Sequence, residues 1–214
     1  MRYKFVDIGS SFFDTSVETF GLDEFGLLIE PIKEAYDLLP FSDKVKRVNV
    51  AISDYNGTGN LLVPENLNIP QKYMTKEDVR NSDINEFNFG QKYAVACSTL
   101  QDKHTLLDRL NIKQKKIECQ VITFYALCEQ YDISEIDYLK IDIEGHEHVV
   151  LKQILDLMDN GKLSINQLVF EYNEHSDKQV LDGYIETIST KFGFNVEFIS
   201  KEWNEDVVLT KNNE

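Results

Sequence analysis

The sequence predicts an α/β fold in which helices flank a mostly parallel sheet. Short β-rich runs alternate with helical patterns along most of the chain. The chain has 214 residues, of which 42% are hydrophobic, so a single domain with a sizeable core is the simplest organisation. The last two β-rich runs lie too close together for a crossover helix between them, so we expect them to be antiparallel.

The predicted strands are seven in number, at 3–8, 26–30, 45–52, 137–143, 165–171, 193–200 and 205–210. Helical patterns at 16–20 and 32–39 separate the first three strands, so two βαβ units open the chain. After Gly145, apolar residues recur at helical spacing as far as a stop at Asn160–Gly161. A further helix over 177–191 precedes the final pair of strands.

The segment 58–100 interrupts this alternation. It is polar, rich in asparagine and only weakly periodic, and a connection of this length in a compact domain is usually functional or mobile. Two interpretations stay open, an insertion that covers a substrate and a surface excursion that the fold tolerates at little cost in closure entropy. The predicted organisation is one domain over 1–214 with an insertion at about 58–100.

The charge of the chain limits the kinds of partner that it can bind. Lys and Arg number 22 against 37 Asp and Glu, which gives a net charge of −15. This charge argues against a nucleic-acid backbone or an anionic membrane as partner. No signal peptide and no membrane-spanning stretch is expected, which favours a cytoplasmic location. The cysteines, Cys97, Cys119 and Cys128, form no CxxC pair, so neither a disulfide framework nor a structural zinc site is predicted.

Acidic residues end three successive predicted strands. They are Asp7, followed by Gly9 in a turn, then Glu30 and Asp54. Ligands of open α/β sheets bind at the carboxyl ends of the strands, and an acidic residue about 20 positions after the first turn commonly meets ribose hydroxyls. Any one of these acids alone is more often a helix cap. Together they favour an adenosine-bearing cation as ligand, and the absence of a GxGxxG pattern disfavours a nicotinamide cofactor.

The stretch "YLKIDIEGHEHVVL" at 138–151 places charged side chains on one face of a predicted central strand. Lys140, Asp142 and Glu144 alternate there with apolar residues. A charge buried against apolar helices costs several kcal/mol, so the alternation indicates a polar pocket at the carboxyl end of this strand. The alternative is that Lys140 pairs with one of the two carboxylates beneath a helix end.

Four segments together resemble the ordered motifs of the FkbM-type S-adenosylmethionine-dependent methyltransferases. They are "VDIGSSFFDTS", "LLIEP", "VNVAISD" and "YLKIDIEGHEHVVL". The resemblance implies a Rossmann-like class I methyltransferase fold, whose seven-stranded, mostly parallel sheet has its last strand antiparallel. It also implies S-adenosyl-L-methionine as cofactor and methyl transfer to a hydroxyl of a carbohydrate or small metabolite.

The same resemblance implies cofactor-binding residues. Asp7, Gly9 and Ser10 correspond to the loop on the methionine side of the cofactor, and Glu30 corresponds to the ribose contact. Ile52 and Asp54 correspond to the adenine pocket.

The first loop departs from the pattern of the family, which reads D-x-G-A-N-x-G. In this sequence Ser10, Ser11 and Phe13 stand at the Ala, Asn and second Gly positions. This departure favours a rival interpretation, in which the chain is a non-catalytic cofactor-binding or accessory module on the same fold.

Methyl transfer to a hydroxyl needs a base that takes the proton. The candidate catalytic residues are Asp142, Glu144, His146, Lys140 and Glu171. His146 and Glu144 rank first as the base, with His148 and His175 as further candidates. His148 follows His146 by two positions on the opening turn of a helix, so the two are not expected to share a face.

Asp142, Glu144 and His146 could also hold a divalent metal, but three residues from one segment rarely complete a site, and no metal is predicted.

Overall fold

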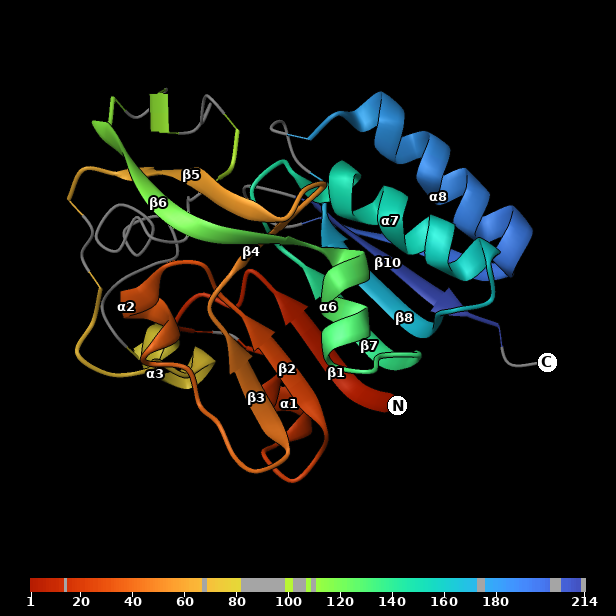
Figure 1. Ribbon diagram of the computed structural model, residues 1–214, viewed down its shortest axis with the longest axis horizontal. Helices are drawn as coiled ribbons and strands as arrows, with labels where there is room; N and C mark the ends of the chain where they lie inside the picture. Colours follow the sequence, from red (N-terminus) through yellow and green to blue (C-terminus); the bar gives the residue numbers. More distant parts are fainter. Residues whose placement is uncertain are drawn as a thin grey trace.

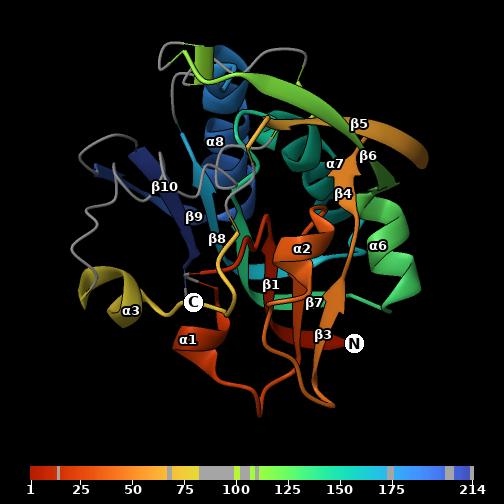
Figure 2. The same cartoon turned by 90° about the vertical axis from the view of Figure 1, so that its left-hand side faces the viewer.

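Two β-sheets and flanking helices make up the protein in the computed structural model (Figure 1). The structure describes residues 1–13, 15–66, 69–81, 99–101, 107–108, 111–172, 176–200 and 205–212. Within these residues, one sheet has seven strands and the other has three. Figures 1 and 2 show the smaller sheet lying across the carboxyl ends of β1 and β2.

The seven-stranded sheet has the order β3-β2-β1-β7-β8-β10-β9. Its strands are β1 (Arg2–Ile8), β2 (Gly26–Ile29), β3 (Val45–Val48), β7 (Glu135–Ile141), β8 (Ser164–Glu171), β9 (Phe194–Ser200) and β10 (Glu205–Lys211). β10 is antiparallel to both β8 and β9, and the other pairs are parallel. This arrangement confirms the predicted fold class, including the antiparallel last strand.

The two faces of the sheet carry different sets of side chains because successive residues of a strand point to opposite sides. On one face, Val6 and Ile8 belong to the main core, which includes buried residues of α6 (Phe124–Gln130), α7 (Glu147–Asp159) and α8 (Lys178–Phe192). On the other face, Phe5 packs in a smaller core that includes side chains of α1 (Val17–Phe20). The sheet is therefore covered on both sides, as a mostly parallel sheet requires.

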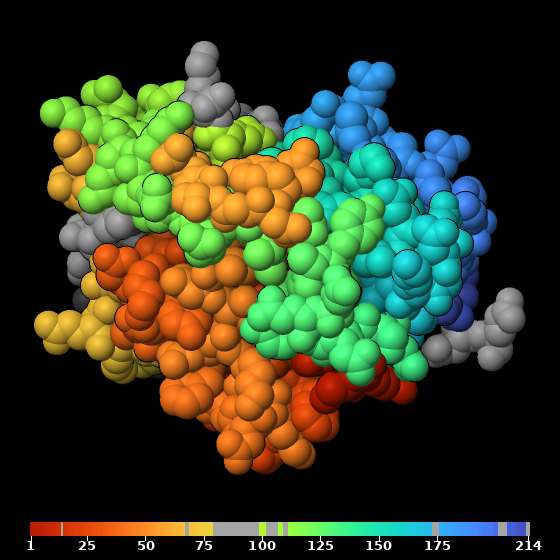
Figure 3. Space-filling view, viewed as in Figure 1, coloured from red at the N-terminus to blue at the C-terminus, as the bar shows by residue number. Residues whose placement is uncertain are grey.

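The ends of the helices follow local capping signals. Asp177 accepts a hydrogen bond from the backbone N–H of Val180 at the start of α8, and Gly193 ends that helix in the left-handed conformation. α7 ends before Asn160–Gly161, as predicted. Figure 3 shows the surfaces of α6 and α7 side by side on one face of the molecule.

The predicted strand 45–52 is wrong as a single element. β3 ends at Val48, and the chain then turns into β4 (Ala51–Ser53), which belongs to the three-stranded sheet. The turn is held by Asn49, whose side-chain amide donates to the carbonyls of Glu30 and Pro31 at 2.8 Å and 3.0 Å. These contacts bend the chain over the carboxyl end of β2.

The first part of the predicted insertion is also a strand. β5 (Gly57–Pro64) pairs antiparallel with β6 (Gln114–Thr123), which the sequence analysis missed, and β4 pairs parallel with the same strand. Apolar residues of β6 pack in a second core under this sheet. α3 (Lys76–Asn81) lies further along the predicted insertion, and positions 82–98 fall outside the described residues.

Gln153 of α7 ties this helix to the end of β4 and the start of α6 from a buried position. Its Oε1 accepts from the backbone N–H of Phe124 at 2.8 Å, and its Nε2 donates to the carbonyl of Ser53 at 2.8 Å. The helix that follows β7 is thus fixed to β4. Across the residues that the structure describes, no helix has both the length and the apolar character needed to cross a bilayer.

Candidate functional site

A cavity lies at the carboxyl ends of β1, β2 and β7, where the strand order changes direction. This is the position at which open α/β sheets bind ligands. Its lining includes eight of the predicted site residues, namely Gly9, Ser10, Glu30, Ile52, Lys140, Asp142, Glu144 and His146. Asp7, Asp54 and Glu171, which were also predicted, are not part of this lining.

Gly9 allows the ends of β1 and β7 to approach closely. Its φ is +83°, and a Cβ at this position would lie 1.8 Å from the backbone oxygen of Asp142. The N–H of Asp142 donates to the carbonyl of Ile8 at 2.9 Å just beside it. Only glycine fits this contact, and the contact brings the two loops of the cavity together.

Asp7 anchors the helix that follows the first loop. Its fully buried Oδ2 accepts from both the backbone N–H and the hydroxyl of Ser16, each at 2.8 Å. Burial raises the pKa of Asp7, and the charge of Lys140 opposes this shift. Among the described residues, Oδ1 of Asp7 has no hydrogen-bond partner.

Ser10 makes its side-chain hydrogen bonds to the backbone. Its hydroxyl donates to the carbonyl of Asp7 at 2.9 Å and accepts from the N–H of Ile29 at 3.1 Å. Ser10 therefore fixes the loop between β1 and β2, and its hydroxyl is engaged there. Its neighbour Ser11 has a φ of +54°, a left-handed conformation that turns its N–H toward Glu30.

Glu30 is buried at the end of β2 and is held by two backbone groups. Oε2 accepts from the N–H of Ser11 at 2.9 Å, and Oε1 accepts from the N–H of Ile32 at 2.8 Å. Burial raises the pKa of Glu30 to about 7. Each carboxylate oxygen has a second lone pair, so Glu30 can accept further hydrogen bonds from a ligand in the cavity.

Apolar side chains form one wall of the cavity. Ile52 and Leu61 from the smaller sheet lie in it, and so does Phe13, which takes the place of a glycine in the family pattern. The ring of Phe13 packs against that of Phe12 at a centroid distance of 5.3 Å. Phe13 is thus part of the wall. Asp54, in contrast, is exposed.

The charged end of β7 lines the opposite side of the cavity. Nζ of Lys140 lies 3.4 Å from Oδ2 of Asp142, with both side chains partly exposed. The two predicted alternatives therefore coexist, since this pair faces the cavity and is also a salt bridge. The predicted strand 137–143 ends too late, because β7 ends at Ile141 and Glu144 adopts a φ of +55° in the following turn.

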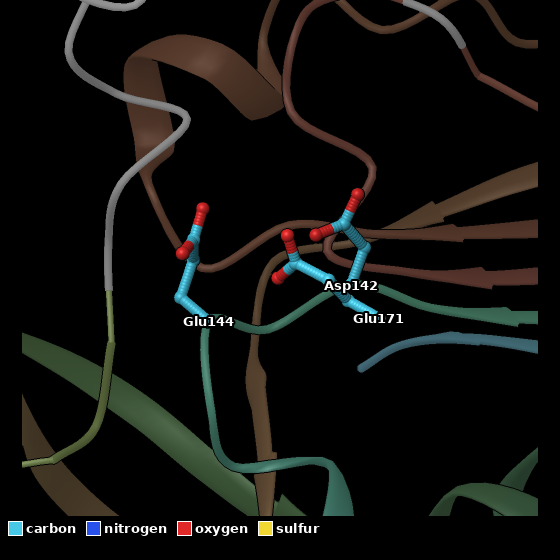
Figure 4. Close-up of side chains that lie close together, drawn as sticks. All are labelled: Asp142, Glu144 and Glu171. Carbon is cyan, nitrogen blue, oxygen red and sulfur yellow. The ribbon is translucent and has the colours of Figure 1, made fainter. Parts of the chain in front are cut away.

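Three carboxylates gather beside this turn. Oxygens of Asp142, Glu144 and Glu171 lie within 4.8 Å of one another, and Figure 4 shows the side chains rising from the turn after β7 and from the end of β8 toward the same space. Burial and the charge of Asp142 raise the pKa of Glu144 well above its ordinary value. Such a group can share a proton or hold a cation. We assign no metal to these three carboxylates.

His146 is not in this group, although the sequence analysis weighed it as a metal ligand with Asp142 and Glu144. Its Nε2 lies 2.9 Å from the hydroxyl of Ser53. Burial is the main cause that lowers the pKa of His146 to about 4, and the neighbouring His148 lowers it further. The imidazole is therefore neutral at physiological pH.

The prediction that His146 and His148 do not share a face is wrong. Their ring centroids lie 5.9 Å apart in an edge-to-face arrangement. The reason is that His146 is the N-cap of α7, with a φ of −98° and a ψ of 7°, so helical spacing does not apply to it. His175, the other predicted candidate, lies outside the described residues.

Glu147 holds the turn between β7 and α7, and the sequence analysis assigned it no role. Its fully buried carboxylate accepts from the N–H groups of Ile143 and Gly145 at 3.1 Å and 3.2 Å, and from the hydroxyl of Ser176 at 3.2 Å. Burial raises the pKa of Glu147 to about 7. Its place in the stretch "YLKIDIEGHEHVVL", which resembles a family motif, was the available signal.

One comparison with known proteins gives a match. A family model described as a methyltransferase FkbM domain matches residues 7–196. No curated protein and no solved structure matches the chain. The matched segment includes all of the described residues that line the cavity.

Proposed function

This chain belongs to the FkbM methyltransferase family, and we propose that it transfers the methyl group of S-adenosylmethionine to a hydroxyl of a carbohydrate or small metabolite. The observation that carries the proposal is the position of Glu30, buried at the end of β2 in the lining of the cavity. A carboxylate there is suited to accept hydrogen bonds from the two ribose hydroxyls.

The rest of the cavity supports the same cofactor. The apolar side chains of Ile52 and Val50 suit one face of an adenine ring. The carboxylates of Asp142 and Glu144 suit a positively charged sulfonium, since opposite charges attract more strongly in a partly buried site than in water. Gly9 keeps the two loops close enough to enclose a ligand.

When bound, S-adenosylmethionine supplies an activated methyl group attached to a sulfonium. The hydroxyl oxygen of the acceptor forms a bond to the methyl carbon as the carbon–sulfur bond breaks, and the hydroxyl proton passes to a base. The side chains of the turn after β7 orient the acceptor in line with that bond, which is the main source of acceleration in such a displacement. His146 and Glu144 are the candidate bases. The role of His146 is supported because its imidazole is neutral at physiological pH and so has a nitrogen that can accept a proton.

The net charge of −15 supports a small-molecule or carbohydrate acceptor over a nucleic acid or an anionic membrane. The smaller sheet and the segment after β5 border the cavity through Leu61 and Leu100. We therefore assign the choice of acceptor to this region. The loops after β7 and β8 are the other part of the chain that we expect to contact the acceptor.

A second candidate function is that of a non-catalytic module that binds the cofactor. The presence of Phe13 at a glycine position of the family pattern favours this candidate. Both candidate functions include binding of the cofactor, but only the first includes turnover of an acceptor.

The test is a calorimetric titration of the purified protein with S-adenosylhomocysteine, beside a titration with NAD as control. Single-site binding of S-adenosylhomocysteine alone supports the methyltransferase cofactor. A screen of sugar and metabolite hydroxyls with methyl-labelled S-adenosylmethionine then distinguishes the enzyme from the non-catalytic module. Binding of NAD, or of neither ligand, contradicts the proposal.

A further inference from the structure

Ser53 connects an imidazole of the cavity to a surface carboxylate. Its hydroxyl lies 2.9 Å from Nε2 of His146 and 3.2 Å from Oδ1 of Asp54. Ser53 is buried at the end of β4, and Asp54 is exposed beside it. The three side chains form a chain of hydrogen bonds from the surface to the cavity.

The chemistry of these groups fixes the direction of both hydrogen bonds. A hydroxyl has a single proton to donate, and a carboxylate accepts hydrogen bonds without donating any. The hydroxyl of Ser53 must therefore donate to Asp54. It follows that Ser53 accepts from His146, so that Nε2 is the protonated nitrogen of the ring.

We propose that Ser53 and Asp54 are positioning residues that hold His146 in its Nε2–H tautomer and leave Nδ1 as the nitrogen that takes the proton of the acceptor hydroxyl. The base role of Nδ1 rests on the proposed methyltransferase function. The tautomer itself depends on the hydrogen bonds alone, because the partner of one ring nitrogen sets the state of the other.

Two observations support Nδ1 as the available nitrogen. His146 lies in the lining of the cavity, and within the described part of the chain no hydrogen bond to its Nδ1 is found. The titratable groups that act on the ring are His148 of α7 and Asp54 after β4. His148 disfavours the charged ring and Asp54 favours it, so the carboxylate also stabilises the imidazolium that forms during the transfer.

The position of Ser53 is fixed from the same helix that begins at His146. Nε2 of Gln153 in α7 donates to the carbonyl of Ser53 at 2.8 Å. This contact holds the end of β4 against the first turns of α7. The serine hydroxyl is thus presented to the imidazole by two elements that are tied together, which is the kind of support that a positioned base requires.

The proposed step balances in protons and electrons. The acceptor oxygen forms its bond to the methyl carbon, and the electron pair of the carbon–sulfur bond leaves with the sulfur. The hydroxyl proton moves to Nδ1 of His146, which gives an imidazolium with N–H groups at both nitrogens. The imidazolium then loses the Nδ1 proton to solvent, and the hydrogen bond from Nε2 to Ser53 is kept throughout.

The test reads the tautomer directly, by long-range 1H–15N correlation of the imidazole rings in labelled protein. The chain has four histidines, and the His146→Gln variant assigns the signal of interest. We expect the Nε2–H pattern in the unaltered protein. Free imidazole side chains also favour this tautomer, so the decisive sample is Asp54→Ala, in which Ser53 is free to donate to Nε2.

In Asp54→Ala we expect the signal of His146 to shift toward the Nδ1–H pattern. Asp54 is exposed, so this variant should fold normally. The matched control is Asp43→Ala, which removes an exposed carboxylate just before β3 and should leave the pattern unchanged. An Nδ1–H pattern in the unaltered protein overturns the tautomer assignment. An unchanged pattern in Asp54→Ala, or an equal shift in both variants, overturns the positioning role of Asp54.

The turnover number tests the base role separately. We expect kcat to fall by at least about tenfold in Asp54→Ala and in Ser53→Ala, with KM little changed, because a general base is worth about 10²-fold or more. Ser53→Thr keeps the hydroxyl and should recover much of the rate.

An unaltered kcat together with a shifted tautomer overturns the role of Nδ1. A shifted tautomer with no methyl transfer even by the unaltered protein overturns the proposed function and the base role, while the hydrogen-bond assignment stands.

Discussion

The backbone N–H of Ser11 donates a 2.9 Å hydrogen bond to Oε2 of Glu30 and so joins the loop after β1 to the end of β2. The left-handed conformation of Ser11, with a φ of +54°, directs the N–H toward that oxygen. A second N–H, from Ile32, holds the other oxygen. The carboxylate is therefore fixed before any ligand arrives, which lowers the entropy cost of binding.

We expect Glu30→Ala to weaken the binding of S-adenosylhomocysteine by at least about tenfold, because the ribose hydroxyls lose a charged acceptor worth about 1.5–3 kcal/mol. Titration calorimetry measures the change. The matched control is Glu34→Ala, which removes an exposed carboxylate from α2 (Lys33–Tyr36). Equal affinity in Glu30→Ala and the unaltered protein would show that the ribose lies elsewhere.

Cofactor binding should also release protons. The pKa of Glu30 is raised to about 7, and a ligand that needs the ionised carboxylate must displace the bound proton. We expect the affinity for S-adenosylhomocysteine to fall as the pH falls below about 7, by up to about tenfold per pH unit. Calorimetry in buffers of different ionisation enthalpy counts the protons. Glu30→Gln should bind without proton release, and release that persists in this variant contradicts the assignment.

The unliganded protein should become less stable as the pH rises from about 4.5 to about 7. Burial raises the pKa of both Glu30 and Glu147 to about 7, above the ordinary value of 4.5. The pKa values of Glu144 and Asp7 shift in the same direction, and that of His146 shifts in the opposite one. The carboxyl groups outnumber the imidazole, so the folded chain binds more protons than the unfolded chain in this window, and stability is lost as the carboxyl groups ionise. Denaturant unfolding at several pH values measures the slope.

Glu147→Gln should make this slope shallower because it removes one of the titrating carboxyl groups and keeps an oxygen for the N–H groups of Ile143 and Gly145. Glu186→Gln, at an exposed position of α8, is the control and should keep the full slope. A slope that is the same in all three proteins contradicts the prediction.

Asp142→Asn should abolish methyl transfer while leaving the binding of S-adenosylhomocysteine within a factor of about three. Asp142 pairs with Lys140 at 3.4 Å and lines the cavity beside Glu144, so its loss changes the charge that the acceptor and the sulfonium meet. Turnover and calorimetry are measured together. Asp159→Asn breaks a comparable pair with Lys191 away from the cavity and should retain activity. Full activity in Asp142→Asn would place the reaction elsewhere.

Gly9→Ala should destabilise the fold more than a conformational penalty alone explains. A Cβ at Gly9 would lie 1.8 Å from the backbone oxygen of Asp142, whereas Gly161 has a similarly positive φ of +64° with no atom within 4 Å of the corresponding position. We expect Gly161→Ala to cost about 1 kcal/mol. Gly9→Ala should cost about 1–3 kcal/mol more, as overpacking does. Denaturant unfolding compares the two, and equal losses would contradict the close approach.

The strands of the large sheet could be predicted because their alternation of apolar and polar residues is local. The division of 45–52 could not, because the side chain of Asn49 bends the chain through contacts with carbonyls that follow β2. β6 was missed although Ile117, Cys119 and Val121 alternate visibly in it. Lys115 and Lys116, near the start of the same strand, make the run look like an exposed loop.

The site could be predicted where topology alone determines position. Glu30 and Lys140 follow from lying at the carboxyl ends of neighbouring strands. The contact between Ser53 and His146 could not be predicted, because it depends on β4 leaving the large sheet. The grouping of Glu171 with Glu144 likewise depends on the shape of the turn that Glu147 holds.

The pairing of β1 with β7 has a consequence for how the chain reaches its folded state. Val6 and Leu139 are partners in this pair although more than about 130 residues separate them. Closing so long a loop is entropically costly, and such contacts slow folding. On the ribosome, β4, β5 and β6 all emerge before β7, so the small sheet can assemble first. The cavity forms only when β7 docks beside β1, which makes the capacity to bind a ligand one of the last properties that the nascent protein acquires.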